Sequence, residues 1–177
     1  MNVHLANTPV IETENLTLRA PGPQDWPIWH DFAITDRAQY IGGPYTTRTA
    51  WRGFGHAVGM WVLRGYGSFV ITFKGDDAAL GMVGPYYPAD WPEKELGWTI
   101  WNPDLEGKGI AYEAALASRR FAYDTLGWTS AVSYIDHGND RSVRLAERLG
   151  AWLDEEAEQP DHSPCMIYRH PSPEALA

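Results

Sequence analysis

The sequence predicts a single domain of the α/β (α+β) class over residues 1–177, built on a mixed, mostly antiparallel central sheet. Its apolar patterns switch between periods of 2 and 3.6 residues and give the order βααβββαβαββ, about seven strands and four helices. One βαβ crossover is expected over Glu95–Ile135, where a long helix joins two strands, and it predicts one parallel strand pair. A hydrophobic content of 44% in 177 residues, with no repeat and no low-complexity linker, supports one core.

The first half of the chain gives three strands and two helices. Asn15–Ala20 alternates and ends at PGP, as a first strand should. Gln24–Thr35 and Thr47–Arg64 have helical periodicity, although three glycines weaken the second. Ser68–Phe73 and Leu80–Tyr86 are rich in β-forming residues and are joined by the polar turn KGDD, which predicts a strand pair.

The second half contains the crossover and the last strands. Glu95–Trp101 is a strand that leads through NPD into a glycine turn and a long alanine-rich helix within Leu105–Trp128. Thr129–Ile135 is the next strand, and Asn139–Leu149 is a helix closed by a glycine in the usual stop position. The segments AWLD and CMIYRH are expected to be the final strands.

The charge balance excludes several classes of function. Fourteen Lys and Arg residues face 23 Asp and Glu residues, a net charge of −9, so nonspecific nucleic-acid binding is not expected and a cationic substrate fits better. The single Cys165 excludes an internal disulfide and suits a reducing compartment. No signal-peptide core and no apolar window of membrane-spanning length is visible, which predicts a cytoplasmic protein without membrane contact.

A glycine turn, Gly107-Lys108-Gly109, stands directly before the long helix. At a helix start four N–H groups lack partners and the helix dipole is positive, so a phosphate can bind there if no side chain blocks it. An ordinary loop before a helix is the alternative. The P-loop pattern fails because no Ser or Thr follows the second glycine, and the dinucleotide fingerprint fails because Tyr112 replaces its third glycine.

Three blocks of sequence resemble the GNAT superfamily of N-acetyltransferases. TIWNPDLEGKGIAYEAA is similar to its acetyl-coenzyme A site, in which a strand ends in x-P-[DE] and a Q/R-x-x-G-x-G/A segment surrounds the pyrophosphate; Pro103, Asp104, Gly109 and Ala111 fill these positions. NDRSVRLAERLGAW resembles the superfamily's later helix. ETENLTLRAPGPQDW resembles the start of the ribosomal-protein N-terminal (alanine/serine) acetyltransferase branch. The blocks follow the family's order and span most of the chain.

The resemblance implies a GNAT-type fold, splayed between its fourth and fifth strands, and acetyl-coenzyme A (acetyl-CoA) as co-substrate without a metal. The coenzyme-binding residues that it implies are Ile100, Trp101, Glu106, Gly107, Lys108, Gly109, Ile110, Ala111, Asn139 and Ser142. Glu106 departs from the usual Gln or Arg, and a carboxylate that points toward a pyrophosphate is unfavourable. Coenzyme binding is retained if Glu106 faces solvent, and Lys108 is a candidate to offset its charge.

The implied reaction is direct attack of a primary amine on the acetyl thioester, helped mainly by positioning. Glu95, at the start of the strand that holds the acetyl group, is the first candidate base for the amine proton, and Glu93 is the second. A solvated charge at a strand edge is the alternative interpretation of Glu95.

A hydrogen-bond donor to the leaving sulfur is expected from the helix that begins near Asn139. Many members of the superfamily supply a Tyr there, but this chain has Ala146, so Ser142 is the candidate, with Tyr134 in reserve. Asn139 is expected to be the helix N-cap as well as a coenzyme contact.

The acceptor is expected to be a protein or peptide N-terminus or a small-molecule amine. One or two tryptophans can supply an apolar or cation-accepting wall for it. The candidates are Trp26, Trp29, Trp51, Trp61 and Trp91. A homodimer is compatible with the sequence. Glu106 and Ala146 keep open a second function, a non-catalytic sensor that binds coenzyme A (CoA) or acyl-CoA.

A metal site is not expected. Asp136, His137, Asp161, His162 and Cys165 lack the spacing of zinc ligands. Cys165 lies in the β-rich run CMIY, where a buried structural cysteine is expected rather than a nucleophile.

Overall fold

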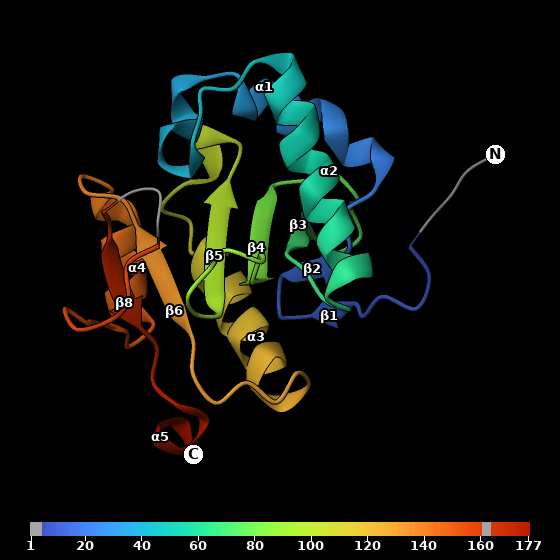
Figure 1. Cartoon of the computed structure of the whole chain (residues 1–177). Coiled ribbons are helices and arrows are strands. Elements are labelled where there is room, and N and C mark those ends of the chain that lie inside the picture. The colour runs from blue at the N-terminus through green and yellow to red at the C-terminus, as the bar shows by residue number, and fades with distance from the viewer. Residues whose placement is uncertain (1–4, 161–163) are drawn as a thin grey trace.

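An eight-stranded sheet forms the centre of the fold, in the order β1-β2-β3-β4-β5-β6-β8-β7. The computed structural model describes residues 5–160 and 164–177. All neighbouring strands are antiparallel except β5 and β6, which confirms the predicted mixed α/β class (Figure 1). The strands are β1 (Ile11–Glu12), β2 (Leu16–Arg19), β3 (Phe69–Phe73), β4 (Gly81–Tyr86), β5 (Glu95–Ile100), β6 (Val132–Ile135), β7 (Trp152–Leu153) and β8 (Met166–Arg169).

Four longer helices correspond to the predicted ones. They are α1 (Trp26–Ala33), α2 (Thr47–Leu63), α3 (Ile110–Asp124) and α4 (Asp140–Arg148). The sequence did not reveal the short helix α5 (Pro173–Leu176), the strand β1 or the 3-10 segments η1 (Pro23–Asp25), η2 (Asp36–Ile41) and η3 (Pro103–Leu105). Each is too short for an apolar period to show.

Local chemistry sets where the early helices begin. Pro27 has no N–H to donate, so it is tolerated only in the first turn, and α1 begins at Trp26 rather than at the predicted Gln24. Helix α2 begins where Thr46 accepts a hydrogen bond from the Thr49 N–H at 3.2 Å.

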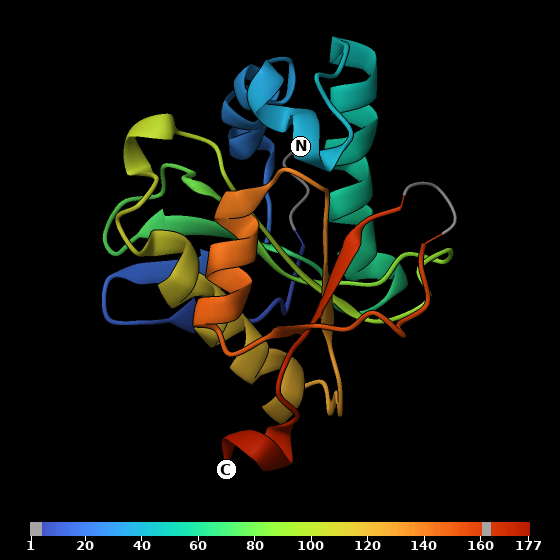
Figure 2. The ribbon, with the colours of Figure 1, turned by 90° about the vertical axis from the view of Figure 1, so that its left-hand side faces the viewer.

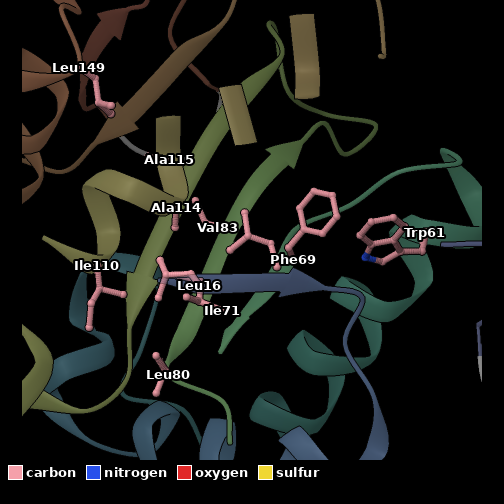
Figure 3. Packing of buried hydrophobic residues seen from close by; sticks show 11 residues of the cluster. Leu16, Trp61, Phe69, Ile71, Leu80, Val83, Ile110, Ala114, Ala115 and Leu149 are labelled. Atoms are coloured by element: carbon pink, nitrogen blue, oxygen red, sulfur yellow. The ribbon is translucent and has the colours of Figure 1, made fainter. Parts of the chain in front are cut away.

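Alternating residues of the central strands divide the core between two faces. Phe69 and Ile71 of β3 pack with Val83 against α3, through Ile110 and Ala114 (Figure 3). Figures 1 and 2 show α3 and α4 on this face and α2 on the opposite one.

The opposite face packs against α1 and α2. Val70 and Met82 of the sheet belong to a second buried cluster, together with Trp29 and Phe32 of α1 and Phe54 of α2. The helices that hold most of the early tryptophans are therefore anchored on the strands that lead to β5.

The sheet opens between β5 and β6, as predicted. These are the fourth and fifth strands expected from the sequence, which did not reveal β1. The two strands pair only at Glu95 and Val132, and beyond this point they diverge (Figure 1). The Ser133 hydroxyl donates to the Leu96 carbonyl at 2.6 Å and also contacts His170 Nε2 at 2.9 Å. A side chain thus replaces a main-chain partner on β6, and the strands separate. Burial lowers the pKa of His170 to about 3, so this group is neutral at pH 7.

Candidate functional site

Two clefts meet where β5 and β6 separate. The first has a volume of about 820 Å³ and lies between η2, the glycine turn and α4. The second has a volume of about 630 Å³ and lies between α1, α2, β4 and β6. Six residues line both clefts: Tyr40, Ile41, Trp98, Thr99, Asn139 and Ser142. Two ligands bound in the two clefts can therefore meet at the break in the sheet.

The glycine turn forms one side of the first cleft. Gly107 and Gly109 have positive φ values of +73° and +84°, and a Cβ added to either meets no atom within 4 Å. Gly109 is the N-cap of α3, and the first bond of this helix runs from the Glu113 N–H to the Gly109 carbonyl. The N–H groups that start α3 thus face an open turn, which is the geometry of an anion cradle. Lys108 is exposed and does not line the cleft.

Four arginines line the same cleft: Arg37 from η2, and Arg141, Arg144 and Arg148 from α4. The last three follow a spacing of three and four residues, which places them on one face of the helix. The Arg148 guanidinium lies 3.8 Å from the centroid of the Tyr112 ring. In a chain of net charge −9, this concentration of positive charge indicates an anionic ligand. Sequence reasoning missed these arginines, although their helical spacing could have revealed three of them.

Strand β5 presents alternate main-chain groups to the break in the sheet. The Leu96 carbonyl accepts from Ser133, and the Ile100 carbonyl accepts from Arg37 Nη2 at 3.0 Å, so even-numbered positions face the break. Trp98 lies between Leu96 and Ile100 on the strand, and its main-chain groups have the same orientation as theirs. The Trp101 N–H donates instead to the Leu80 carbonyl at 2.9 Å.

Trp101 is therefore placed away from the break, contrary to its expected role beside the coenzyme. Its side chain is buried against Trp29 and Phe32 and lines neither cleft. Period-two alternation along the strand could have identified Trp98 and Ile100 as the pair that shares one edge.

Glu95 is half-buried in the second cleft. Burial raises the pKa of its carboxyl group to about 7, while a hydrogen bond from Trp91 Nε1 at 2.6 Å acts in the opposite direction. A carboxylate with such a pKa can accept a proton near neutral pH. Glu93, the second candidate base, is instead held by Arg169 through two hydrogen bonds of 2.8 Å and does not line either cleft.

The protein-family model of the acetyltransferase (GNAT) domain matches residues 15–151 of this chain. The chain belongs to the GNAT acetyltransferase family. GNAT enzymes use acetyl-CoA as co-substrate, so this protein is an acetyl-CoA-dependent acyltransferase. The resemblance found in the sequence is thereby confirmed.

Solved GNAT structures share the whole fold. An acetyltransferase from Agrobacterium tumefaciens is 35% identical, with 97% of this chain and 99% of that chain covered and a TM-score of 0.87. The ribosomal-protein-S5-alanine acetyltransferase of Vibrio fischeri is 15% identical, with 94% and 98% covered and a TM-score of 0.69. The RimL acetyltransferase of ribosomal L7/L12 is 17% identical, with 92% and 93% covered and a TM-score of 0.70. At these lower identities the last two show the fold alone.

The residues of the first cleft fit the GNAT coenzyme. An open glycine turn at a helix start and a row of arginines suit phosphates, and Leu105, Ile110 and Leu145 supply apolar lining for the rest of the ligand. Arg37 also has a buried Nε without a partner in the described part of the chain. An unpartnered buried donor is expected where a ligand completes the site.

Glu106, the departure from the GNAT pattern, does not face solvent freely. One carboxylate oxygen accepts from Arg37 Nη2 at 2.7 Å, and the other accepts from Arg141 Nη1. Its side chain is 26% exposed. Two arginines therefore offset the charge of this carboxylate, a role that the sequence suggested for Lys108.

Helix α4 supplies the remaining GNAT positions. Asn139 is its N-cap and accepts from the Ser142 N–H at 3.3 Å, as predicted. The Ser142 hydroxyl accepts from Trp98 Nε1 at 3.2 Å at the junction of the clefts. Ala146 is fully buried in the core and lines neither cleft, so this position contributes no group to the site.

Three further features concern a metal site, the Cys165 thiol and the length of the helices. No group of three or more His, Cys, Asp or Glu side chains that could hold a metal occurs within residues 5–160 and 164–177, and Asp161 and His162 lie outside the described residues. Burial raises the pKa of the Cys165 thiol to about 11, which disfavours the nucleophilic thiolate. None of the helices in the described part of the chain combines the length and apolar character needed to span a membrane.

Proposed function

We propose that this GNAT enzyme transfers the acetyl group of acetyl-CoA to a primary amine, with the coenzyme in the first cleft and the amine in the second. The observation that supports it is the junction of the two clefts at Trp98 and Ser142. Two reactants bound at this junction already lie next to each other, so their positioning supplies most of the acceleration of acetyl transfer.

The first cleft would hold the coenzyme through groups already described. The phosphates suit the turn at Gly107 and Gly109 together with the arginines, and the linear arm suits the open edge of β5 at Trp98 and Ile100. Asn139 adds a side-chain contact at the same cleft. When bound, the coenzyme supplies an activated acetyl thioester.

Glu95 would accept the amine proton. Its carboxyl group lies in the second cleft with a pKa near neutrality, so the ionised form is available at pH 7. The amine nitrogen then bonds to the acetyl carbon and the carbon–sulfur bond breaks. The nitrogen gives up a second proton in this step, and a proton is taken up by the leaving sulfur, so the charges balance. The products are an N-acetyl amide and free coenzyme A.

Ser142 would donate a hydrogen bond toward the sulfur, because its oxygen already accepts from Trp98 and its own proton remains available. Tyr134 lines only the second cleft, and its hydroxyl accepts from the Glu93 N–H at 3.2 Å. Burial raises the pKa of Tyr134 to about 12, well above that of a thiol, so this group is a hydrogen-bond donor rather than a proton source.

Coenzyme binding tests the proposal directly. Calorimetric titration of the wild type with acetyl-CoA should give saturable binding. Titration with ATP or NAD should give none. Gly109→Asp should abolish binding, because it places a carboxylate in the turn. Gly65→Asp is the matched control, since Gly65 has a φ of +77°, open surroundings and a position outside both clefts.

If the wild type ignores acetyl-CoA at millimolar concentration, the proposal is wrong. Retained binding without acetylation of any amine in a broad panel would instead favour the sensor that the sequence left open.

A further inference from the structure

The second cleft carries the opposite charge from the first. Among its described lining residues, the acidic side chains are Glu95 and Asp136, and no Lys or Arg is present. The first cleft is lined by four arginines against two carboxylates, Asp36 and Glu106, which leaves an excess of positive charge. A protonated amine is therefore attracted to this cleft, and an acceptor with a carboxylate is repelled.

Aromatic rings line the same cleft on several sides. They are Trp29, Tyr40, Tyr45, Tyr86, Trp91, Trp98 and Tyr134. These residues come from α1, η2, the segment before α2, β4, the β4–β5 loop, β5 and β6. Rings bury large apolar area and accept cations on their faces, so they match a flat apolar body that carries an amine.

Trp91 connects this aromatic wall to the proposed base. Its ring packs edge-on against Tyr86 at 5.6 Å and against Tyr134 at 5.9 Å, measured between ring centroids. Its Nε1 donates to the Glu95 carboxylate at 2.6 Å. A ring body bound against Trp91 would thus lie close to the proton acceptor, which requires only a short linker between ring and nitrogen.

A hydrogen bond links the two sides of the break. The Tyr40 hydroxyl of η2 donates to the Gly138 carbonyl, in the loop between β6 and α4, at 3.0 Å. An extended peptide needs an open groove with main-chain partners along its length. This link and the apolar lining favour a compact acceptor instead.

Resting on the proposed acetyl transfer, we propose that the acceptor is a small arylalkylamine. Its primary amine would be joined through a short aliphatic linker to an aromatic ring, with no carboxylate next to the nitrogen. The products are the N-acetylated arylalkylamine and free coenzyme A, by the bond changes given above. Asp136 would select against carboxylates, since it adds a negative charge to the cleft beside that of Glu95.

Coenzyme A release from acetyl-CoA, followed with a thiol reagent, tests this acceptor class on the full-length enzyme. The panel contains 2-phenylethylamine, phenylalanine, propylamine and an unstructured peptide that begins Ser-Ala. Phenylalanine adds only a carboxylate to the first amine, and propylamine lacks the ring. The kcat/KM value for 2-phenylethylamine should exceed each of the others by about tenfold or more.

A charge variant tests the role of Asp136. Asp136→Asn should reduce the preference for 2-phenylethylamine over phenylalanine by about threefold or more. Asp124→Asn removes the same charge from an exposed position at the end of α3, outside both clefts, and should leave the preference unchanged.

The other outcomes separate the two proposals. Preference for the peptide, or equal rates for all four amines, overturns the arylalkylamine acceptor and leaves the acetyltransferase proposal standing. Acetyl-CoA binding with no amine acetylated overturns the acceptor proposal, and absence of acetyl-CoA binding overturns both.

Discussion

The Glu106 carboxylate and the Arg37 guanidinium meet at 2.7 Å, and they join the segment before the glycine turn to η2 in the lining of the first cleft. Arg141 from α4 holds the other oxygen of the same carboxylate. Two guanidiniums that could face phosphate are therefore shared with a protein carboxylate.

Glu106→Gln should tighten acetyl-CoA binding. The substitution removes a negative charge near the proposed phosphate site and frees Arg37 and Arg141 for the ligand. A gain of about 1 kcal/mol, roughly fivefold in Kd, is expected at low ionic strength, and it should shrink as salt is added. Calorimetric titration at two salt concentrations measures both effects.

Glu147→Gln is the matched control for Glu106→Gln. Glu147 is exposed on α4 and lines neither cleft, so its loss should leave the Kd unchanged. Weaker binding by Glu106→Gln would show that the carboxylate positions the arginines rather than competing with the coenzyme for them.

Activity should depend on the ionisation of Glu95. The carboxylate is the active form, so kcat/KM should rise with pH below about pH 7. As the pH passes this value, the slope of log kcat/KM against pH should fall by one. Glu95→Gln should remove this break and lower the rate about a hundredfold or more. Trp91→Phe removes a hydrogen bond that favours the charged form, so the pKa should rise and the break should move to higher pH.

Trp51→Phe serves as the control for the pH profile. Trp51 is 60% exposed on α2 and lies outside both clefts, so its loss should not move the break. A break that survives in Glu95→Gln would assign the titration to another group.

The sequence predicted the regular elements because each had a clear period. The β-rich runs of β3 and β4 and the crossover over Glu95–Ile135 led to the correct class, and the resemblance to GNAT implied the splayed sheet. The N-cap role of Asn139 was also predictable, because it depends on a local hydrogen bond.

The partners within the site were not predictable in the same way. Arg37 lies in a 3-10 segment without an apolar period, and it meets Glu106 across 69 positions of sequence. Ion pairs between distant segments depend on the complete fold, which no local pattern encodes. The edge of β5 that faces the break depends likewise on which neighbour the Trp101 N–H binds.

Helix α2 should gain stability from Gly55→Ala. Gly55 lies in the helix interior, is exposed, and has no atom within 4 Å of an added Cβ. Alanine there should add about 0.5–1 kcal/mol to the free energy of unfolding, because it reduces the conformational freedom of the unfolded chain. Thermal denaturation followed by circular dichroism measures the change.

Gly75→Ala makes the opposite test. Gly75 has equally open surroundings but a φ of +78°, where a Cβ is strained, so the same substitution should lower the stability by about 1 kcal/mol. Equal effects at the two positions would contradict the conformational argument.

The pair Arg19 and Asp25 explains why the opening block has an arginine followed six residues later by an aspartate. Arg19 ends β2, and its Nη1 and Nη2 donate to the two oxygens of Asp25 at 2.8 and 2.7 Å. The same carboxylate accepts from the Gly22 N–H at 2.8 Å, and Asp25 is only 1% exposed. The pair therefore fixes the path from the sheet into α1, which supplies Trp29 to the second cleft.

Asp25→Ala should destabilise the fold strongly. It leaves a guanidinium that is only 15% exposed without its main partner, and breaking a buried pair in this way costs about 3–5 kcal/mol. Asp77→Ala removes the other carboxylate bound to Arg19, but Asp77 is 68% exposed, so about 1 kcal/mol or less is expected. Urea unfolding of both variants measures the difference. Similar decreases in the free energy of unfolding for the two variants would mean that water solvates Arg19 when Asp25 is absent. The Arg19–Asp25 pair would then not explain the pattern of the opening block, Glu12–Trp26.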